Sequence, residues 1–142
     1  MLLKKGVTGI FPQAETILEP LESLHFKRMC HSVFKNVISF DIEISNKNFY
    51  VARLDSDLYA LLNAYYPLLA FANAVAPFNI TFVDNTGSAE AFSNYYRVLN
   101  TDELNIPLSI ESISNTLDKV EIEQIDYWRP KTIGEVIFNY WD

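Results

Sequence analysis

The amino-acid sequence predicts a single α+β domain, in which a mainly antiparallel sheet packs against helices. Residues 38–54 alternate apolar and polar side chains on both sides of a short polar stretch, Ser45–Asn48, which is the pattern of a β-hairpin. Residues 21–36 place apolar side chains at helical spacing and charged side chains largely elsewhere. Such a helix is expected to cover one face of the sheet.

Length and composition limit the classes of protein to consider. The chain has 142 residues, 49% of them hydrophobic, so residues 1–142 are expected to form one globular domain with its own core. The net charge of −7 favours basic partners and disfavours direct contact with nucleic acid or membranes. Cys30 is the only cysteine, and residues 1–11 lack the apolar region of a signal peptide, so we expect a cytoplasmic location.

The first elements follow from local patterns. Residues 1–11 are apolar and contain two glycines, which suits an edge strand or a docked N-terminal arm. After the helix predicted over 21–36, residues 38–44 alternate between branched or aromatic and polar side chains, as a half-buried strand does. Phe49–Leu54 is expected to be the second strand of the hairpin.

The longest apolar stretch is Leu58–Phe78, LYALLNAYYPLLAFANAVAPF, which contains no Lys, Arg, Asp or Glu. About 20 apolar residues are enough to cross a bilayer, so a membrane span must be considered. Two asparagines, Asn63 and Asn73, and two prolines, Pro67 and Pro77, interrupt the stretch. These interruptions favour a buried core in a soluble protein.

Within this stretch the spacing of leucines predicts a helix from about 58 to 66. Asp55 and Asp57 precede it and are suitable N-cap residues. Pro67 would end the helix, and residues 68–75 would then form a buried strand or a second helix.

The following segments carry weaker patterns. Asn79–Val83 is expected to be a strand that ends at a polar turn, after which Ser88 could cap a short helix. Residues 95–99 fit a helix or a strand equally well. Apolar residues at spacings of three and four predict a helix over 109–119.

The C-terminal part is predicted to contain a strand and a final element. Residues 120–127 alternate as a strand does. Thr132 and Glu135 have the spacing of a capping box ahead of an apolar helical face, although Gly134 weakens that helix and a terminal strand remains an alternative.

No residue pattern indicates catalysis, a cofactor or a metal. His25, Cys30 and His31 point in different directions on a helix, and no further Cys or His completes a ligand set. The turn DNTGS has one glycine and no lysine, so it is expected to be an ordinary helix cap rather than a phosphate loop. We therefore do not expect an enzyme.

The densest group of carboxylates lies beside two aromatic residues near the C-terminus. Solvated surface charge is the ordinary interpretation of such a group. The alternative is a negative docking patch, because aromatic residues flanked by charge are typical of protein interfaces. The candidate partner-binding residues are Asp118, Glu121, Glu123, Asp126, Tyr127 and Trp128.

The segment YWRPKTIGEVIFNYWD, with support from the opening LLKKGVTGIF, resembles small acidic immunity proteins that are encoded beside bacterial polymorphic toxins. The nearest resemblance is to the immunity partners of cell-wall-associated YD-repeat toxins of Bacillus and its relatives. It implies a cytoplasmic protein, without catalytic residues, that binds and blocks the toxic C-terminal domain of a cognate toxin, commonly a nuclease. An acidic chain suits a basic nuclease site. The alternative function is a small-molecule or peptide-binding module whose pocket is lined by the aromatic-rich stretch Leu58–Phe78.

Overall fold

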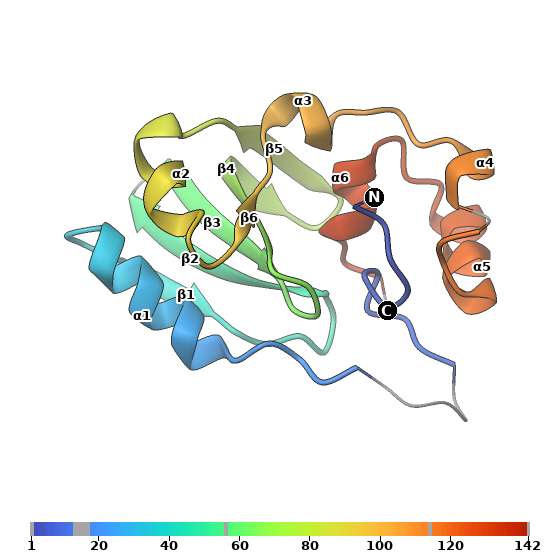
Figure 1. Cartoon of the computed structure of the whole chain (residues 1–142), viewed down its shortest axis with the longest axis horizontal. Coiled ribbons are helices and arrows are strands. Elements are labelled where there is room, and N and C mark those ends of the chain that lie inside the picture. The colour runs from blue at the N-terminus through green and yellow to red at the C-terminus, as the bar shows by residue number, and fades with distance from the viewer. Residues whose placement is uncertain (1, 13–17, 56, 114, 142) are drawn as a thin grey trace.

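The computed structural model describes residues 2–12, 18–55, 57–113 and 115–141. In this part of the chain, a six-stranded sheet is packed with helices (Figure 1). In the view of Figure 1, α1 and α2 lie toward one end of the molecule, and α4, α5 and α6 lie toward the other. The predicted α+β fold, with a mainly antiparallel sheet packed against helices, is confirmed.

The strands β1 to β5 follow one another across the sheet, each antiparallel to its neighbour, and β6 runs parallel to the start of β4. The strands are β1 (Ser39–Asp41), β2 (Phe49–Asp55), β3 (Leu58–Asn63), β4 (Leu68–Ala76), β5 (Asn79–Val83) and β6 (Arg97–Val98). The helices are α1 (Ser23–Val33), α2 (Thr86–Phe92), α3 (Thr101–Leu104), α4 (Ile110–Ile113), α5 (Lys119–Trp128) and α6 (Ile133–Ile137). The sequential strand order explains why the sheet is mostly antiparallel, because short connections join neighbouring strands.

The sheet has a hydrophobic core on each face. On the first face, which we call the α1 face, Phe26 and Cys30 of α1 and Phe92 of α2 are buried against the strands. On the second face, the α6 face, residues of α6 and α5 and of the segment 2–12 pack on the strands. Neighbouring residues of one strand enter different cores, as Leu61 and Leu62 do.

Burial on both faces explains the first part of the charge-free stretch, residues 58–72. A strand covered on both sides has no solvent face that needs polar residues, so its sequence is continuously apolar. Residues 73–78 are mostly exposed, so the expectation that the whole stretch is buried is wrong for its end. The helix predicted over 58–66 is therefore wrong, because 58–63 is strand β3, whereas the strand alternative for 68–75 is confirmed as β4. In the part of the chain that the structure describes, no helix combines the length and hydrophobicity needed to cross a membrane.

Other expectations are confirmed in outline and corrected in detail. The hairpin over 38–54 is present as β1 and β2, although β1 is only three residues long. The helix expected over 21–36 is present as α1. The helix expected over 109–119 is limited to α4, and the uncertain stretch 95–99 contains β6. The strand expected over 120–127 is wrong, because this stretch is helix α5.

The N-terminal arm, residues 2–12, forms turns and docks on the α6 face. Of the two predicted alternatives, an edge strand and a docked arm, the docked arm is therefore confirmed. The side-chain amides of Asn48 and Asn63 each donate to the backbone oxygens of Val7 and Ile137, at distances of 2.8–2.9 Å. Asn139 donates to Thr8 of the arm at 3.1 Å. These three buried asparagines, which we call the asparagine clamp, fasten both ends of the chain to the sheet.

Candidate functional site

Helix α5 carries the predicted partner-binding residues. Its N-terminus is closed by a capping box, in which Asp118 is the N-cap and the Glu121 side chain accepts a hydrogen bond from the Asp118 backbone N–H at 3.1 Å. Ile125 faces the core, at one turn from Glu121. The helix ends at Arg129, which adopts a left-handed conformation with φ of 53°. The capping box therefore sets where α5 begins, and the left-handed turn sets where its outer face ends.

The structure separates the six candidate residues. Glu123, Asp126 and Tyr127 are exposed, and 75% of the Tyr127 surface is accessible. Asp118 is partly exposed at 29% and forms an ion pair with Lys5 at 3.5 Å. These four residues could contact a partner.

Glu121 is a correction to the predicted docking patch, because it is fully buried. Its carboxylate accepts hydrogen bonds from the backbone N–H groups of Gly6, at 3.0 Å, and Thr8, at 3.3 Å, and from the Thr8 hydroxyl. A buried carboxylate needs such partners, since desolvation without them is strongly unfavourable. Glu121 therefore holds the N-terminal arm against α5 and does not face solvent.

Trp128 is half-buried and forms the centre of an aromatic strip. Its ring stacks on Phe78, with ring centroids 5.1 Å apart and an interplanar angle of 23°, and meets Tyr127 edge-on at 5.0 Å. Its indole N–H donates to Gln124 at 2.9 Å, which fixes the ring on α5. Phe78 and Tyr127, at the two ends of the strip, are both exposed. The strip joins the turn between β4 and β5 to the last turn of α5.

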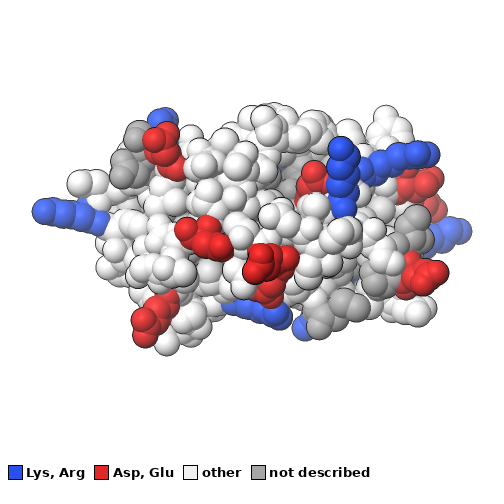
Figure 2. Space-filling view, turned by 90° about the horizontal axis from the view of Figure 1, so that it is seen from above, with Lys and Arg blue, Asp and Glu red and all other residues white. Residues whose placement is uncertain are grey.

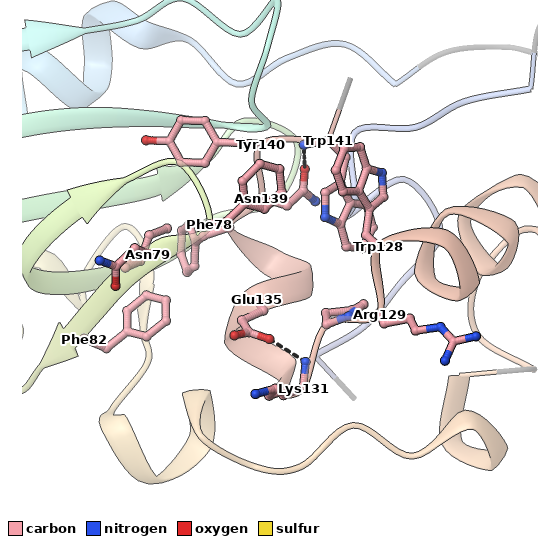
Figure 3. A pocket seen from close by; sticks show the side chains of 13 residues that line it. Phe78, Asn79, Phe82, Trp128, Arg129, Lys131, Glu135, Asn139, Tyr140 and Trp141 are labelled. Atoms are coloured by element: carbon pink, nitrogen blue, oxygen red, sulfur yellow. Dashed lines mark hydrogen bonds between the residues drawn. The ribbon is translucent and has the colours of Figure 1, made fainter.

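A cavity of about 250 Å³ lies beside this strip (Figure 3). Aromatic side chains are the largest group among its lining residues, and Figure 3 shows Phe78, Trp128 and Tyr140 around it. Charged lining residues come from the end of α5, the following segment and α6. Among them, the Glu135 carboxylate accepts a hydrogen bond from the Lys131 backbone N–H. Burial and the charge of Asp41 raise the pKa of the Tyr140 hydroxyl, so this group stays protonated at neutral pH.

The charged residues of α5 border a second hollow, between α4 and α5, with a volume of about 840 Å³. Ile113, Leu117 and Ile122 are among its apolar lining residues, and Glu123 and Asp126 belong to its lining as well. Figure 2 shows acidic side chains at several separate places on the face seen from above, with Lys and Arg side chains among them. On this face the carboxylates do not form one continuous acidic patch.

The alternative function, a pocket lined by Leu58–Phe78, stays a prediction. Strands β3 and β4 contain most of this stretch, and Phe78 is its one residue in the aromatic cavity lining. The signal that could have placed Phe78 at this site is the Pro77-Phe78-Asn79 sequence between two strands. A hairpin turn exposes its central residues.

The histidines and the cysteine lie on the other side of the molecule. The His25 ring nitrogen Nδ1 is 2.8 Å from the Tyr96 hydroxyl, and the His31 ring lies edge-on to Phe40. Burial raises the pKa of the Cys30 thiol to about 12, so this thiol is protonated and unreactive at neutral pH. Across the described ranges, no group of three or more His, Cys, Asp or Glu is placed to hold a metal ion.

Comparison of the chain with protein-family models, with curated proteins and with solved structures gave no match. The inference of function therefore depends on the surface of α5, on the aromatic strip and on the charge of the chain.

Proposed function

We propose that the protein is a cytoplasmic immunity protein that binds and neutralises the toxic C-terminal domain of a cognate polymorphic toxin, commonly a nuclease, by protein–protein contact. The observation that carries the proposal is the outer face of α5. There the exposed Tyr127 is supported by Trp128 and is accompanied by Glu123 and Asp126. Large aromatic side chains that are rigidly held and bordered by charge are the usual anchors of protein interfaces.

The charge of the chain supports the same proposal. A net charge of −7 attracts a basic partner, and the phosphate-binding surface of a nuclease is basic. Complementary charge chiefly increases the association rate and the specificity. Glu123 and Asp126 are the two candidate carboxylates free to act in this way, because Glu121 is buried and Asp118 is paired with Lys5.

The proposal is tested with the C-terminal domain of the protein encoded immediately upstream of this chain. Co-expression of the chain should restore growth to cells that produce this domain, and the two proteins should co-purify. Growth inhibition that persists in the presence of a well-expressed chain would refute the proposed function.

The contribution of the α5 carboxylates has its own test. Glu123→Lys with Asp126→Lys should reduce the association rate at 0.1 M salt by more than tenfold. At 1 M salt, where the Debye length falls from about 10 Å to about 3 Å, the association rates of this double variant and of the wild type should differ much less. The matched control is Asp57→Lys with Glu90→Lys, which makes the same change in net charge at exposed positions away from α5. Equal rates for the two double variants would eliminate the carboxylates as the steering group.

A further inference from the structure

The aromatic cavity is lined by two non-glycine residues with a left-handed backbone, Phe78 with φ of 59° and Arg129 with φ of 53°. A side chain with a Cβ atom is disfavoured in this conformation, whereas glycine and asparagine adopt it readily. Such strain is concentrated at binding and catalytic sites. Arg129 takes this conformation because it ends α5, whereas Phe78 takes it in the β4–β5 turn, at the wall of the cavity.

The Phe78 side chain buries little apolar surface, so its burial does little to offset the strain of the left-handed backbone. Its side chain is 65% exposed, and its closest aromatic contact is the stacked ring of Trp128. A glycine or an asparagine in this turn would relieve the backbone, and a smaller exposed side chain would remove apolar surface from water. The folded chain alone therefore gives no sufficient reason for phenylalanine here, which indicates that the ring is used in binding.

The size of the cavity limits what could enter it. Pockets for drug-sized ligands have volumes of roughly 300–1,000 Å³. At about 250 Å³, the cavity is smaller than these and suits a single large side chain of another protein.

The lining of the cavity limits the chemistry of the occupant. Six of the 13 lining residues are aromatic, and the charged lining residues are Arg129, Lys131 and Glu135. Figure 3 shows the Arg129 side chain extending away from the rings. Charges of opposite sign at the margin leave no preference for an ionic occupant. Aromatic walls favour edge-to-face or offset contact with another ring.

We propose that this cavity, between the β4–β5 turn and the segment after α5, receives one uncharged aromatic side chain that protrudes from the toxin domain. This inference rests on the proposed function and names the anchor of the same interface. Phe78 and Trp128 form the wall against which the incoming ring packs. Tyr127, Glu123 and Asp126 then contact the partner beside this anchor.

The first experiment measures the affinity of the full chain and its variants for the toxin domain encoded immediately upstream. Phe78→Asn removes the wall and keeps a residue that tolerates a left-handed backbone, so it should weaken binding at least tenfold without lowering the melting temperature. The control is Tyr95→Asn, because Tyr95 is similarly exposed at 58%, also has a ring neighbour in His25, and lies near α2. It should change the affinity less than twofold.

The second experiment identifies the occupant. Each exposed aromatic residue of the toxin domain is replaced by alanine, and each variant is measured against wild type and against Phe78→Asn. One replacement should weaken binding to wild type at least tenfold and should have little further effect on Phe78→Asn, which is the signature of a direct contact in a double-mutant cycle.

The possible results separate the two proposals. If the wild-type chain does not bind the toxin domain, the proposed function fails. If the wild type binds and Phe78→Asn binds equally well, the function stands and the anchor inference is overturned. Coupling of Phe78 to an arginine or lysine of the toxin domain, and to no aromatic residue, would also overturn the inference.

Discussion

The two faces of the sheet are closed by different means. On the α1 face, apolar and aromatic side chains such as Phe26 and Phe92 form the cover. On the α6 face, the core also encloses polar side chains, namely the asparagine clamp and Glu121. In the described part of the chain, every buried side-chain nitrogen and oxygen has a hydrogen-bond partner. Apolar side chains that cover a sheet must only be complementary in shape. A buried polar network, in contrast, satisfies its hydrogen bonds in only one arrangement of its partners.

This difference determines where a precise surface can be built. The polar groups of the α6 face bind the N-terminal arm, the end of α6 and the start of α5 in one fixed relation. The aromatic strip includes the last turn of α5, and the cavity includes residues 138–141, which follow α6. We infer that the polar network positions the candidate binding surface, and each of the following predictions tests the contrast between the two faces.

The largest loss in the free energy of unfolding is expected for Asn63→Ala. The Asn63 amide donates to Val7 and Ile137, and its oxygen accepts from the backbone N–H groups of Tyr65, at 2.9 Å, and Tyr66, at 3.0 Å. Val7 and Ile137 keep the Asn48 donor, so the N–H groups of Tyr65 and Tyr66 are the ones left without a partner. Each such group costs about 1–3 kcal/mol, so the free energy of unfolding should fall by about 4 kcal/mol. Urea denaturation measures it.

Asn73→Ala is the control for this prediction, because Asn73 lies in the neighbouring strand β4 and is exposed. A loss below about 0.5 kcal/mol is expected there. Similar losses for the two variants would show that the clamp has no special role.

The second-largest loss in the free energy of unfolding is expected for Glu121→Gln. The amide that replaces one carboxylate oxygen would face a donor of Gly6 or of Thr8 and could not accept from it. The free energy of unfolding should fall by about 2–3 kcal/mol. Glu123→Gln, two residues away on the exposed side of α5, should change it by less than about 0.5 kcal/mol. Hydrogen exchange should increase at residues 6–8 in the first variant alone, and protection that stays at the wild-type level would contradict the assigned role.

Elements with a complete local signal could be predicted from the sequence. The amphipathic pattern of α1 identifies its buried face, and the structure agrees. The alternation over 38–44 predicts the β1–β2 hairpin, although Ile38, expected on its apolar face, is 55% exposed. The capping interaction of Thr132 was also predictable, since its hydroxyl accepts from the Glu135 backbone N–H at 3.3 Å. The predicted cap Ser88 is replaced by Asn85, whose side chain accepts from the Ser88 backbone N–H at 3.1 Å. Both signals lie within four residues of the helix start.

The two wrong elements failed for a tertiary reason. Strand β3 is covered on both faces, so its leucines fit helical spacing as well as they fit a strand. Helix α5 alternates apolar residues with glutamates, and this alternation suggested a strand. Glu121 is buried there only because Gly6 and Thr8, more than 110 residues earlier, supply its donors. A local pattern contains no information about such partners.

The candidate site was predictable to a similar extent. The exposure of Glu123, Asp126 and Tyr127 agrees with a docking surface near the C-terminus, and the sequence could not decide whether Trp128 is buried. Phe78 was assigned to the buried core, although the structure places it at the surface in a tight turn. Its role as a wall depends on its positive φ and on contact with Trp128, 50 residues later, and neither can be read from composition or spacing.

A smaller effect on the free energy of unfolding is expected on the α1 face, for the buried thiol of Cys30. Burial raises the pKa of its thiol from 9.0 to about 12, so the folded chain keeps a proton that the unfolded chain releases. Stability from this group is fully present below pH 9 and is lost as the pH rises toward 12, by about 1.4 kcal/mol per pH unit. Urea denaturation at pH 8, 9 and 10 should show this decline in wild type and a weaker one in Cys30→Ala. Equal slopes would contradict the burial of the thiol.

The smallest effect on stability, with a large effect on binding, is expected for Tyr127→Ser. The Tyr127 side chain is exposed and its ring contact is the edge of Trp128, so the free energy of unfolding should change by less than about 0.5 kcal/mol. If Tyr127 is an anchor, the toxin domain should dissociate at least tenfold faster, because removal of an anchor acts mainly on the dissociation rate. The carboxylate variants should instead act on association. Surface plasmon resonance distinguishes the two, and a slower association with unchanged dissociation for Tyr127→Ser would place the tyrosine at the interface rim and leave the aromatic cavity as the anchor.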